Sequence, residues 1–94
     1  MAYSTNNPPA LVSQMVGKDG GSKWMYDSAD AATTVRADGY ITDGADLGMK
    51  VGDTVEQIDT AGGTVHHQYT VAAVNSDGSV DLSDGTAVST TDTD

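Results

Sequence analysis

The sequence has no cysteine and no phenylalanine, and it is poor in large apolar residues of any kind. Without cysteine the chain forms neither a disulfide framework nor a thiolate zinc site, which fits assembly in a reducing cytoplasm. Leu, Ile and Val together supply only 15 of 94 residues, against a formal net charge of −10. Such a composition is typical of chains that bury too little apolar surface to fold alone. We therefore expect this chain to bury surface against partners or copies of itself, and not to act as an isolated monomeric enzyme.

Basic residues are equally scarce and lie in one half of the chain. All four Lys and Arg residues fall within residues 1–50, whereas residues 51–94 carry eight acidic residues and no Lys or Arg. Because such a surface repels phosphate, we expect neither nucleic acid nor an anionic membrane as a partner. The sequence has no apolar run of membrane-spanning length, and its start lacks the pattern of a signal peptide. We expect a soluble chain that is not exported by the usual route.

Residues 1–12 are predicted to form an extended N-terminal arm. Pro8 and Pro9 favour extended geometry for the residues before them and prevent an immediate helix. We expect the arm to lie on a neighbouring molecule through its apolar residues. The candidates for this partner interface are Tyr3, Pro8, Pro9, Leu11 and Val12. Residues 13–88 are predicted to form a single β-rich domain, followed by an acidic C-terminal tail over residues 89–94.

Alternating apolar residues between glycine-rich turns predict a mainly β domain. Strands are expected over residues 11–16, 23–26, 54–59, 64–74 and 79–82. Val55 and Ile58 are out of phase in the third of these, which suggests a β-bulge. Beyond Gly85 the chain is either solvated or adds an edge strand. The fold predicted is a small β-barrel or sandwich with one short helix.

That helix is predicted over residues 28–38. Ser28 or Asp30 is suited to the N-cap, several alanines favour helix, and Gly39 is suited to the left-handed residue that ends it. The alternative is a strand over residues 33–37 that turns at Asp38-Gly39, since Asp-Gly is a strong hairpin signal.

Three aromatic residues, Trp24, Tyr26 and Tyr40, are candidates either for the core or for stacking on a sugar. We expect a core role, because the chain has no phenylalanine to fill the centre of the fold.

The sequence carries few residues arranged for chemistry. His66 and His67 are neighbours in a predicted strand, so they point to opposite faces and do not share a metal within one subunit. One histidine from each of three copies at a three-fold axis remains an alternative. The glycine-rich segment over residues 17–23 lacks the Gly-Lys-Ser/Thr ending of a phosphate loop, and no nucleophile elbow is present. We expect no cofactor, no metal and no enzymatic activity.

Several motifs resemble a group of small virion proteins of tailed bacteriophages and prophages. The resemblance covers residues 6–88. The motifs are Asn7-Pro8-Pro9-x-Leu11-Val12-Ser13-Gln14, Trp24-x-Tyr26, Ser28-Ala29-Asp30-Ala31-Ala32-Thr33, Ala37-x-Gly39-Tyr40-Ile41, Asp46-Leu47-Gly48-Met49-Lys50-Val51-Gly52-Asp53, Val71-x-Ala73-Val74-Asn75-Ser76-x-Gly78 and Asp81-Leu82-Ser83-Asp84-Gly85-Thr86. Ile41 departs from the group, in which an aromatic residue is common at this position.

The resemblance implies a phage structural protein, and two roles follow from it. The first is a capsid decoration (cement) protein that assembles in the host cytoplasm, binds the major capsid protein on the outer head surface as a homotrimer and stabilises the shell. Many weakly bound copies gain avidity, and an acidic outer surface keeps the particle off stray nucleic acid. The alternative is a head-fibre or tail-associated adhesion module that contacts host glycans through Trp24, Tyr26 or Tyr40.

Overall fold

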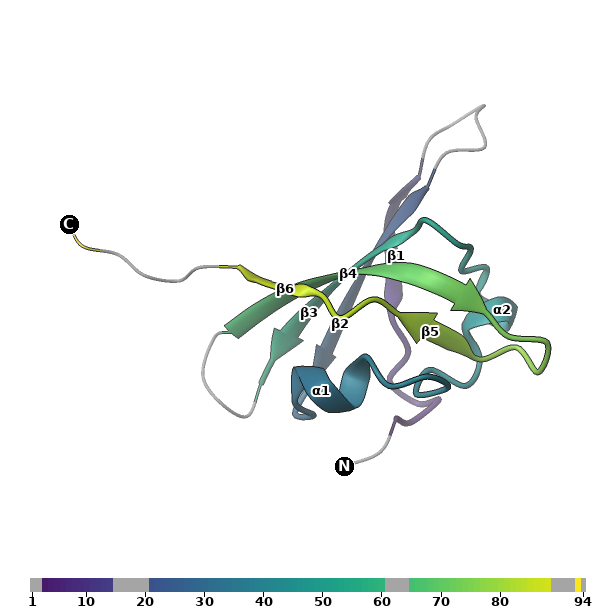
Figure 1. Ribbon diagram of the computed structural model, residues 1–94, viewed down its shortest axis with the longest axis horizontal. Helices are drawn as coiled ribbons and strands as arrows, with labels where there is room; N and C mark the ends of the chain where they lie inside the picture. Colours follow the sequence, from purple (N-terminus) through teal and green to yellow (C-terminus); the bar gives the residue numbers. More distant parts are fainter. Residues whose placement is uncertain (1–2, 15–20, 61–64, 89–92, 94) are drawn as a thin grey trace.

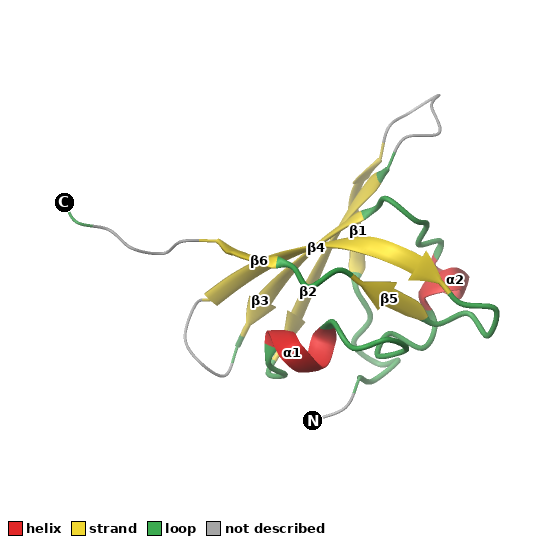
Figure 2. Ribbon diagram, in the orientation of Figure 1, coloured by secondary structure: helices red, strands yellow, loops and turns green. Residues whose placement is uncertain are grey.

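The computed structural model describes residues 3–14, 21–60, 65–88 and 93. Over these ranges the chain is mainly β, as predicted, and its strands form one twisted, open sheet rather than a closed barrel (Figure 2). The strands are β1 (Ala10–Gln14), β2 (Ser22–Ser28), β3 (Thr54–Asp59), β4 (Val65–Val74), β5 (Val80–Leu82) and β6 (Thr86–Val88), and the helices are α1 (Ala32–Val35) and α2 (Gly44–Leu47). Neither helix in these ranges is long and apolar enough to cross a membrane.

The sheet has the strand order β1-β2-β3-β4-β5, and β6 pairs with β4 beside β5. Strands β2 and β3 are parallel and all other pairs are antiparallel. Because a parallel pair needs a crossover, the chain between β2 and β3 carries α1 and α2. Strands β5 and β6 pair with residues 71–74 and 66–68 of β4, so they form one interrupted arm of a long hairpin (Figure 1).

The core lies on one face of the sheet. Trp24 and Tyr26 of β2 alternate with more exposed neighbours, and Val35 of α1 is fully buried. The buried apolar residues are Trp24, Tyr26, Val35, Ile41, Met49, Val55, Tyr69, Val71, Val80 and Leu82. Ile41 also bridges to Val80, which covers the free side of β5. The rings of Trp24, Tyr26 and Tyr69 therefore contribute to the core of a chain that has no phenylalanine.

The predicted bulge between Val55 and Ile58 is wrong. Strand β3 pairs residue by residue with both β2 and β4 from Thr54 to Asp59. Gln57, not Ile58, takes the inward position after Val55 and is fully buried, whereas Ile58 is only partly buried on the opposite face. The pattern of apolar residues does not reveal this arrangement, because a glutamine is compatible with burial only when its side chain is hydrogen-bonded.

The helix predicted over residues 28–38 is confirmed only over Ala32–Val35: its predicted length is wrong, and it ends at Arg36 rather than at Gly39. The alternative strand over residues 33–37 is wrong. The helix is a single turn, α1, that begins after Ala31 and has no side-chain cap. Ser28 Oγ instead accepts a hydrogen bond from the Asp30 backbone N–H, and the Asp30 carboxylate is bound by Tyr40. Both proposed capping residues are therefore engaged elsewhere.

The second helix, α2, was not predicted. It packs against the tip of the β4–β5 hairpin, where the Ala45 N–H donates to the Gly78 carbonyl at 2.9 Å. Gly44 lies so close to Val80 that a Cβ at this position would be 2.4 Å from Val80 Cγ1. The glycine is thus explained by close packing between α2 and β5.

The N-terminal segment lies on its own domain rather than projecting from it. Tyr3 packs against the core, Pro9 is buried, and Asn7 Nδ2 donates to the Asp27 carbonyl at 2.8 Å. From Ala10 onward the chain is strand β1, paired with β2. At the other end, residues 86–88 form the edge strand β6, one of the two alternatives given for this region. The rest of the expected first strand (residues 15–16), the turns at residues 17–20 and 61–64, and the tail apart from Thr93 lie outside the described residues.

Candidate interaction surface

Trp24 is a core residue that is held by a buried carboxylate. Its side chain is 3% exposed, and its Nε1 donates to Asp53 Oδ2 at 3.0 Å. The backbone N–H groups of Ser22 and Lys50 donate to the same carboxylate at 2.9 and 3.0 Å. Three donors satisfy a charge that would otherwise be costly to bury. Asp53 therefore ties the start of β2 to the start of β3, and Trp24 is not placed to stack on a ligand.

Tyr3, Tyr26 and Tyr40 form a cluster where the N-terminal segment meets the domain. Their ring centroids lie 5.5 to 6.3 Å apart. The Tyr40 hydroxyl donates to Asp30 Oδ2 at 2.5 Å and is 2.9 Å from the Tyr26 hydroxyl. The Tyr3 hydroxyl donates to Asp43 Oδ1 at 2.5 Å. The cluster thus fastens residue 3 to the crossover by ring contacts and charged hydrogen bonds together.

The protonation states of the cluster follow from these contacts. Burial, together with hydrogen bonds to Asp43 and Asp30, raises the pKa of Tyr3 and of Tyr40 far above the usual tyrosine value. Burial alone would raise the pKa of Asp30, but the hydrogen bonds to its carboxylate, that from Tyr40 foremost, outweigh burial and lower it. At neutral pH the tyrosines are donors and Asp30 is an anion.

Gln57 extends this cluster across the sheet. Its Nε2 donates to the Asp30 carbonyl at 2.9 Å, and its Oε1 accepts from the Tyr69 hydroxyl at 2.6 Å. A line of hydrogen bonds therefore runs from β4 through β3 to the crossover. Neither Gln57 nor Asp53 was singled out from the sequence. The usable signal for Gln57 was its inward phase with Val55, and for Asp53 the turn glycine before it, Gly52, whose φ is +94°.

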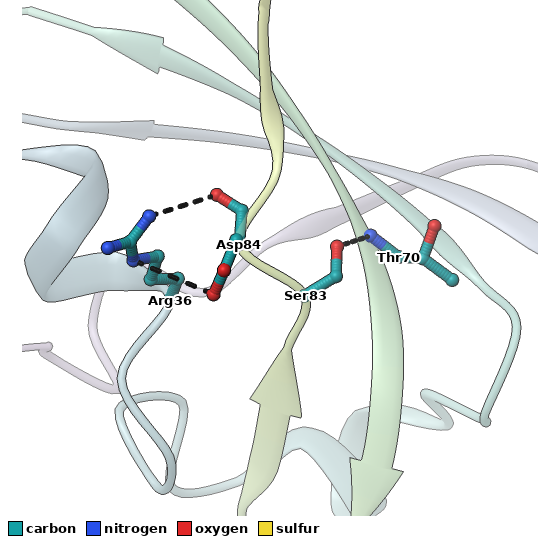
Figure 3. A network of polar contacts seen from close by, with 4 residues as sticks. All are labelled: Arg36, Thr70, Ser83 and Asp84. Carbon is teal, nitrogen blue, oxygen red and sulfur yellow. Dashed lines mark hydrogen bonds and ion pairs between the residues drawn. The ribbon is translucent and has the colours of Figure 1, made fainter.

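Further polar contacts involve Ser83 and Asp84, which lie in the segment between β5 and β6 (Figure 3). Arg36, at the end of α1, points to Asp84, with its Nη1 3.5 Å from the Asp84 carbonyl and its Nε 4.0 Å from Oδ1. Beside it, Ser83 Oγ accepts from the Thr70 N–H at 2.9 Å. The Asp84 side chain is 93% exposed, so this ion pair adds little stability. The contact joins the end of α1 to the segment between β5 and β6.

Exposed apolar side chains are concentrated on two strands. Among the residues whose burial the structure describes, the exposed large hydrophobic ones are Leu11, Val12, Val51 and Val88, and three of these lie on β1 or β6. Of the five residues expected at a partner interface, Tyr3 and Pro9 are taken up by their own domain. The other three, Pro8, Leu11 and Val12, are exposed and close together in the chain. These three residues are the part of the expected interface that is available to a partner.

The histidines lie on opposite faces of β4, in agreement with the strand alternation. His66 pairs with Ile58 and Val88, and His67 pairs with Gln57 and Ala87. The His67 ring stacks on Tyr69 at an interplanar angle of 20°. Its Nδ1 is buried and has no hydrogen-bond partner among the described atoms. Among all the residues that the structure describes, no group of three His, Asp or Glu side chains is placed to hold a metal ion.

A hollow of about 350 Å³ lies between the tyrosine cluster and the end of α1. Tyr3 and Tyr40 form its aromatic wall. The remaining lining residues are Thr34, Ala37, Asp38, Gly39 and Thr42. Of the three aromatic residues considered for sugar stacking, only Tyr40 is accessible, because Trp24 and Tyr26 are buried. The hollow combines ring faces with hydroxyl and carboxylate groups, which is a composition suited to a small polar ligand.

Comparison with known proteins gives no relative: no family model, no curated protein and no solved structure matches this chain.

Proposed function

We propose that this chain is a bacteriophage capsid decoration protein, which binds the major capsid protein on the outer head surface in many copies and stabilises the shell. The observation that carries the proposal is the exposure of Pro8, Leu11 and Val12, three uncharged residues between positions 8 and 12 of an otherwise acidic small domain. Exposed apolar residues gathered in one place mark protein interaction sites. The motifs over residues 6–88 that resemble virion proteins support the same conclusion.

The energetics of the domain favour a role in a repeating assembly. A small, weakly bound unit gains affinity when many copies engage neighbouring sites on one surface. The acidic residues that are exposed, among them Asp27, Asp46 and Asp77, keep such a coat soluble and away from nucleic acid. A homotrimer on the particle would also bury apolar surface that the single chain leaves exposed.

Binding to heads that lack this chain tests the proposal. Purified protein is mixed with undecorated heads of the phage that encodes it, and the pelleted material is quantified against the major capsid protein. We expect saturable co-sedimentation at many copies per head and an increase in the temperature at which the heads rupture. The Trp24→Ala variant, expected to be unfolded, serves as the control for binding that requires the fold. Pelleting of the wild type no greater than that of this control would contradict the proposal.

One observation favours a second candidate function, adhesion to host glycans. The hollow beside Tyr40 offers an accessible ring with hydroxyl and carboxylate groups around it, and an aromatic face with such groups suits a sugar. Titration of host surface polysaccharide, followed by the fluorescence of the chain, compares the wild type with Tyr40→Ala and with Val51→Ala. Adhesion predicts binding that Tyr40→Ala removes and Val51→Ala retains. Equal responses of the two variants would exclude this hollow as the site.

A further inference from the structure

Strands β1 and β6, referred to below as the two outer strands, differ from the other four strands in charge. Strands β2, β3, β4 and β5 each carry at least one ionisable residue: Lys23, Glu56, His66 and Asp81 are examples. Strands β1 (ALVSQ) and β6 (TAV) carry none, although the chain has a net charge of −10. Natural proteins usually place charges or proline on edge strands to prevent pairing with other chains. Strands β1 and β6 have neither charge nor proline, whereas β5, which also lies at an edge, carries Asp81.

Both outer strands are also accessible along their length. Every residue of β1 and of β6 is exposed. Leu11 and Val12 are 47% and 52% exposed, and Val88 is 42% exposed. Within the described ranges, β1 pairs only with β2 and β6 only with β4. Each strand therefore presents one row of backbone N–H and C=O groups that has no strand beside it, together with apolar side chains that a partner strand could cover.

We propose that copies of this chain join head to tail, with β1 of one copy adding to the free edge of β6 in the next. The occupant is a second copy, because the two edges have the same chemistry and belong to the two ends of one sheet. Pairing one with the other continues the sheet across the contact. Uncharged edges also allow two acidic molecules to approach without bringing like charges directly opposite one another. A contact between different surfaces of identical chains forms a ring where the rotation closes.

This inference deepens the proposed function and rests on it only for the gathering of copies on one surface. A two-fold contact of β1 with β1 would use one edge and leave β6 uncovered. Head-to-tail pairing uses both strands that carry exposed large hydrophobic residues in the described ranges: Leu11 and Val12 on β1 and Val88 on β6. Because strands this short form few hydrogen bonds, we expect the association to be reversible in solution, with an associated fraction that rises with protein concentration.

Thiol cross-linking tests the pairing directly, because the native chain has no cysteine. Two variants of the full chain, Ser13→Cys on β1 and Ala87→Cys on β6, are mixed and treated with a bismaleimide of about 10 Å span, which reaches opposite and diagonal neighbours on paired strands. Ser76→Cys, in the exposed turn after β4, provides the background. We expect the 13–87 mixture to give dimer several-fold above the 13–76 mixture, and each variant alone to give background only. Efficient linking of Ser13→Cys with itself, or background in every mixture, overturns the proposal.

Charge at the edge gives an independent measurement. Val12→Asp places a carboxylate on β1, whereas Val51→Asp makes the same change at a more exposed valine in a turn. Sedimentation velocity over a dilution series should show that Val12→Asp is monomeric at concentrations where the wild type and Val51→Asp associate. Identical behaviour of both variants overturns the edge assignment. If the protein binds heads but shows neither the cross-link nor the effect of Val12→Asp, the proposed function stands and the pairing of β1 with β6 is wrong. If it shows both but does not bind heads, the pairing stands and the proposed function is wrong.

Discussion

The middle of the sheet and its two ends are built on different principles. Strands β2, β3 and β4 bury Trp24, Gln57 and Tyr69, and each of these side chains is fixed by a hydrogen bond as well as by packing. Strands β1 and β6 bury nothing and are held by one neighbour each. The difference indicates that the stability of the fold resides in the centre, while the ends remain available for association.

Buried polar residues with hydrogen-bond partners allow a chain with so few large apolar residues to form a core. Asp53 and Gln57 are fully buried, and Asp30 is 4% exposed, yet each accepts or donates hydrogen bonds to aromatic side chains or backbone groups. Satisfied polar networks of this kind specify one arrangement, but they are costly to disrupt because the remaining partners are left unpaired. Substitutions in the centre should therefore have much larger effects than substitutions at the ends.

Replacing Trp24 should have the largest effect. Trp24→Ala empties a buried aromatic position, which usually costs about 3–5 kcal/mol of unfolding free energy. A small domain has little stability beyond this amount, so we expect the variant to be largely unfolded. Trp24→Phe retains most of the ring but loses the hydrogen bond to Asp53, and it should lose less. Thermal melting followed by circular dichroism compares the three proteins. A cooperatively folded Trp24→Ala with an unchanged melting temperature would show that the centre does not depend on this ring.

Removing the Asp53 carboxylate should be the next most costly change. Asp53→Ala leaves Trp24 Nε1 and the backbone N–H groups of Ser22 and Lys50 without their acceptor. We expect a loss of about 2–4 kcal/mol, since unsatisfied buried donors each carry a desolvation penalty. Asp53→Asn keeps one acceptor oxygen and should recover part of the loss. Urea unfolding monitored by tryptophan fluorescence gives both values; equal stability of the two variants would contradict a role for the acceptor.

Two glycines separate steric contact from backbone strain. A Cβ on Gly85 would lie 2.6 Å from Tyr69 Cδ1 and 2.9 Å from the Gln68 carbonyl oxygen, at a φ of +81°. At Gly48, with a φ of +97°, a Cβ would meet nothing within 4 Å. We expect Gly48→Ala to cost about 1 kcal/mol from strain alone. Gly85→Ala should cost about 1–3 kcal/mol more, because Tyr69 must move. If melting curves show the same loss of stability for Gly85→Ala and Gly48→Ala, the segment leading to β6 shifts to accommodate the Cβ and Tyr69 stays in place.

The hydrogen bond from Tyr40 to Asp30 should give a smaller effect that depends on pH. The pKa of Asp30 is lowered in the fold, so its carboxylate stabilises the native state above the unfolded pKa of about 4, and this contribution is lost as the pH falls through the folded value. Tyr40→Phe should therefore cost about 1 kcal/mol at pH 7, and its difference from the wild type should shrink toward pH 2. Tyr26→Phe loses only a contact between hydroxyl groups and should show no such trend. A pH-independent difference for Tyr40→Phe would contradict the assignment.

The sequence predicted the strands better than the polar contacts that join them. The strand boundaries at residues 54–59 and the burial of Trp24 follow from alternation, turn residues and the absence of phenylalanine. The partners of Asp53 and Gln57 do not, because a buried polar residue looks like a surface residue until its hydrogen-bond partner, distant in sequence, is known. The helix α2 was missed for a similar reason: four residues are too few to show periodicity, and Gly44 is explained only by its contact with Val80.

The smallest effects are expected at the edge strands. Val12→Ala and Val88→Ala remove methyl groups from side chains that are 52% and 42% exposed, and we expect changes within about 0.5 kcal/mol. The same substitution at Val55, which is 0% exposed in β3, should cost about 2 kcal/mol. These measurements need dilute protein, because association through β1 and β6 would cover the edge valines and add stability that grows with concentration. If Val12→Ala remains as costly as Val55→Ala on dilution, β1 belongs to the core of the single chain. If its cost appears only as the concentration rises, the outer strands contribute to association and not to the fold.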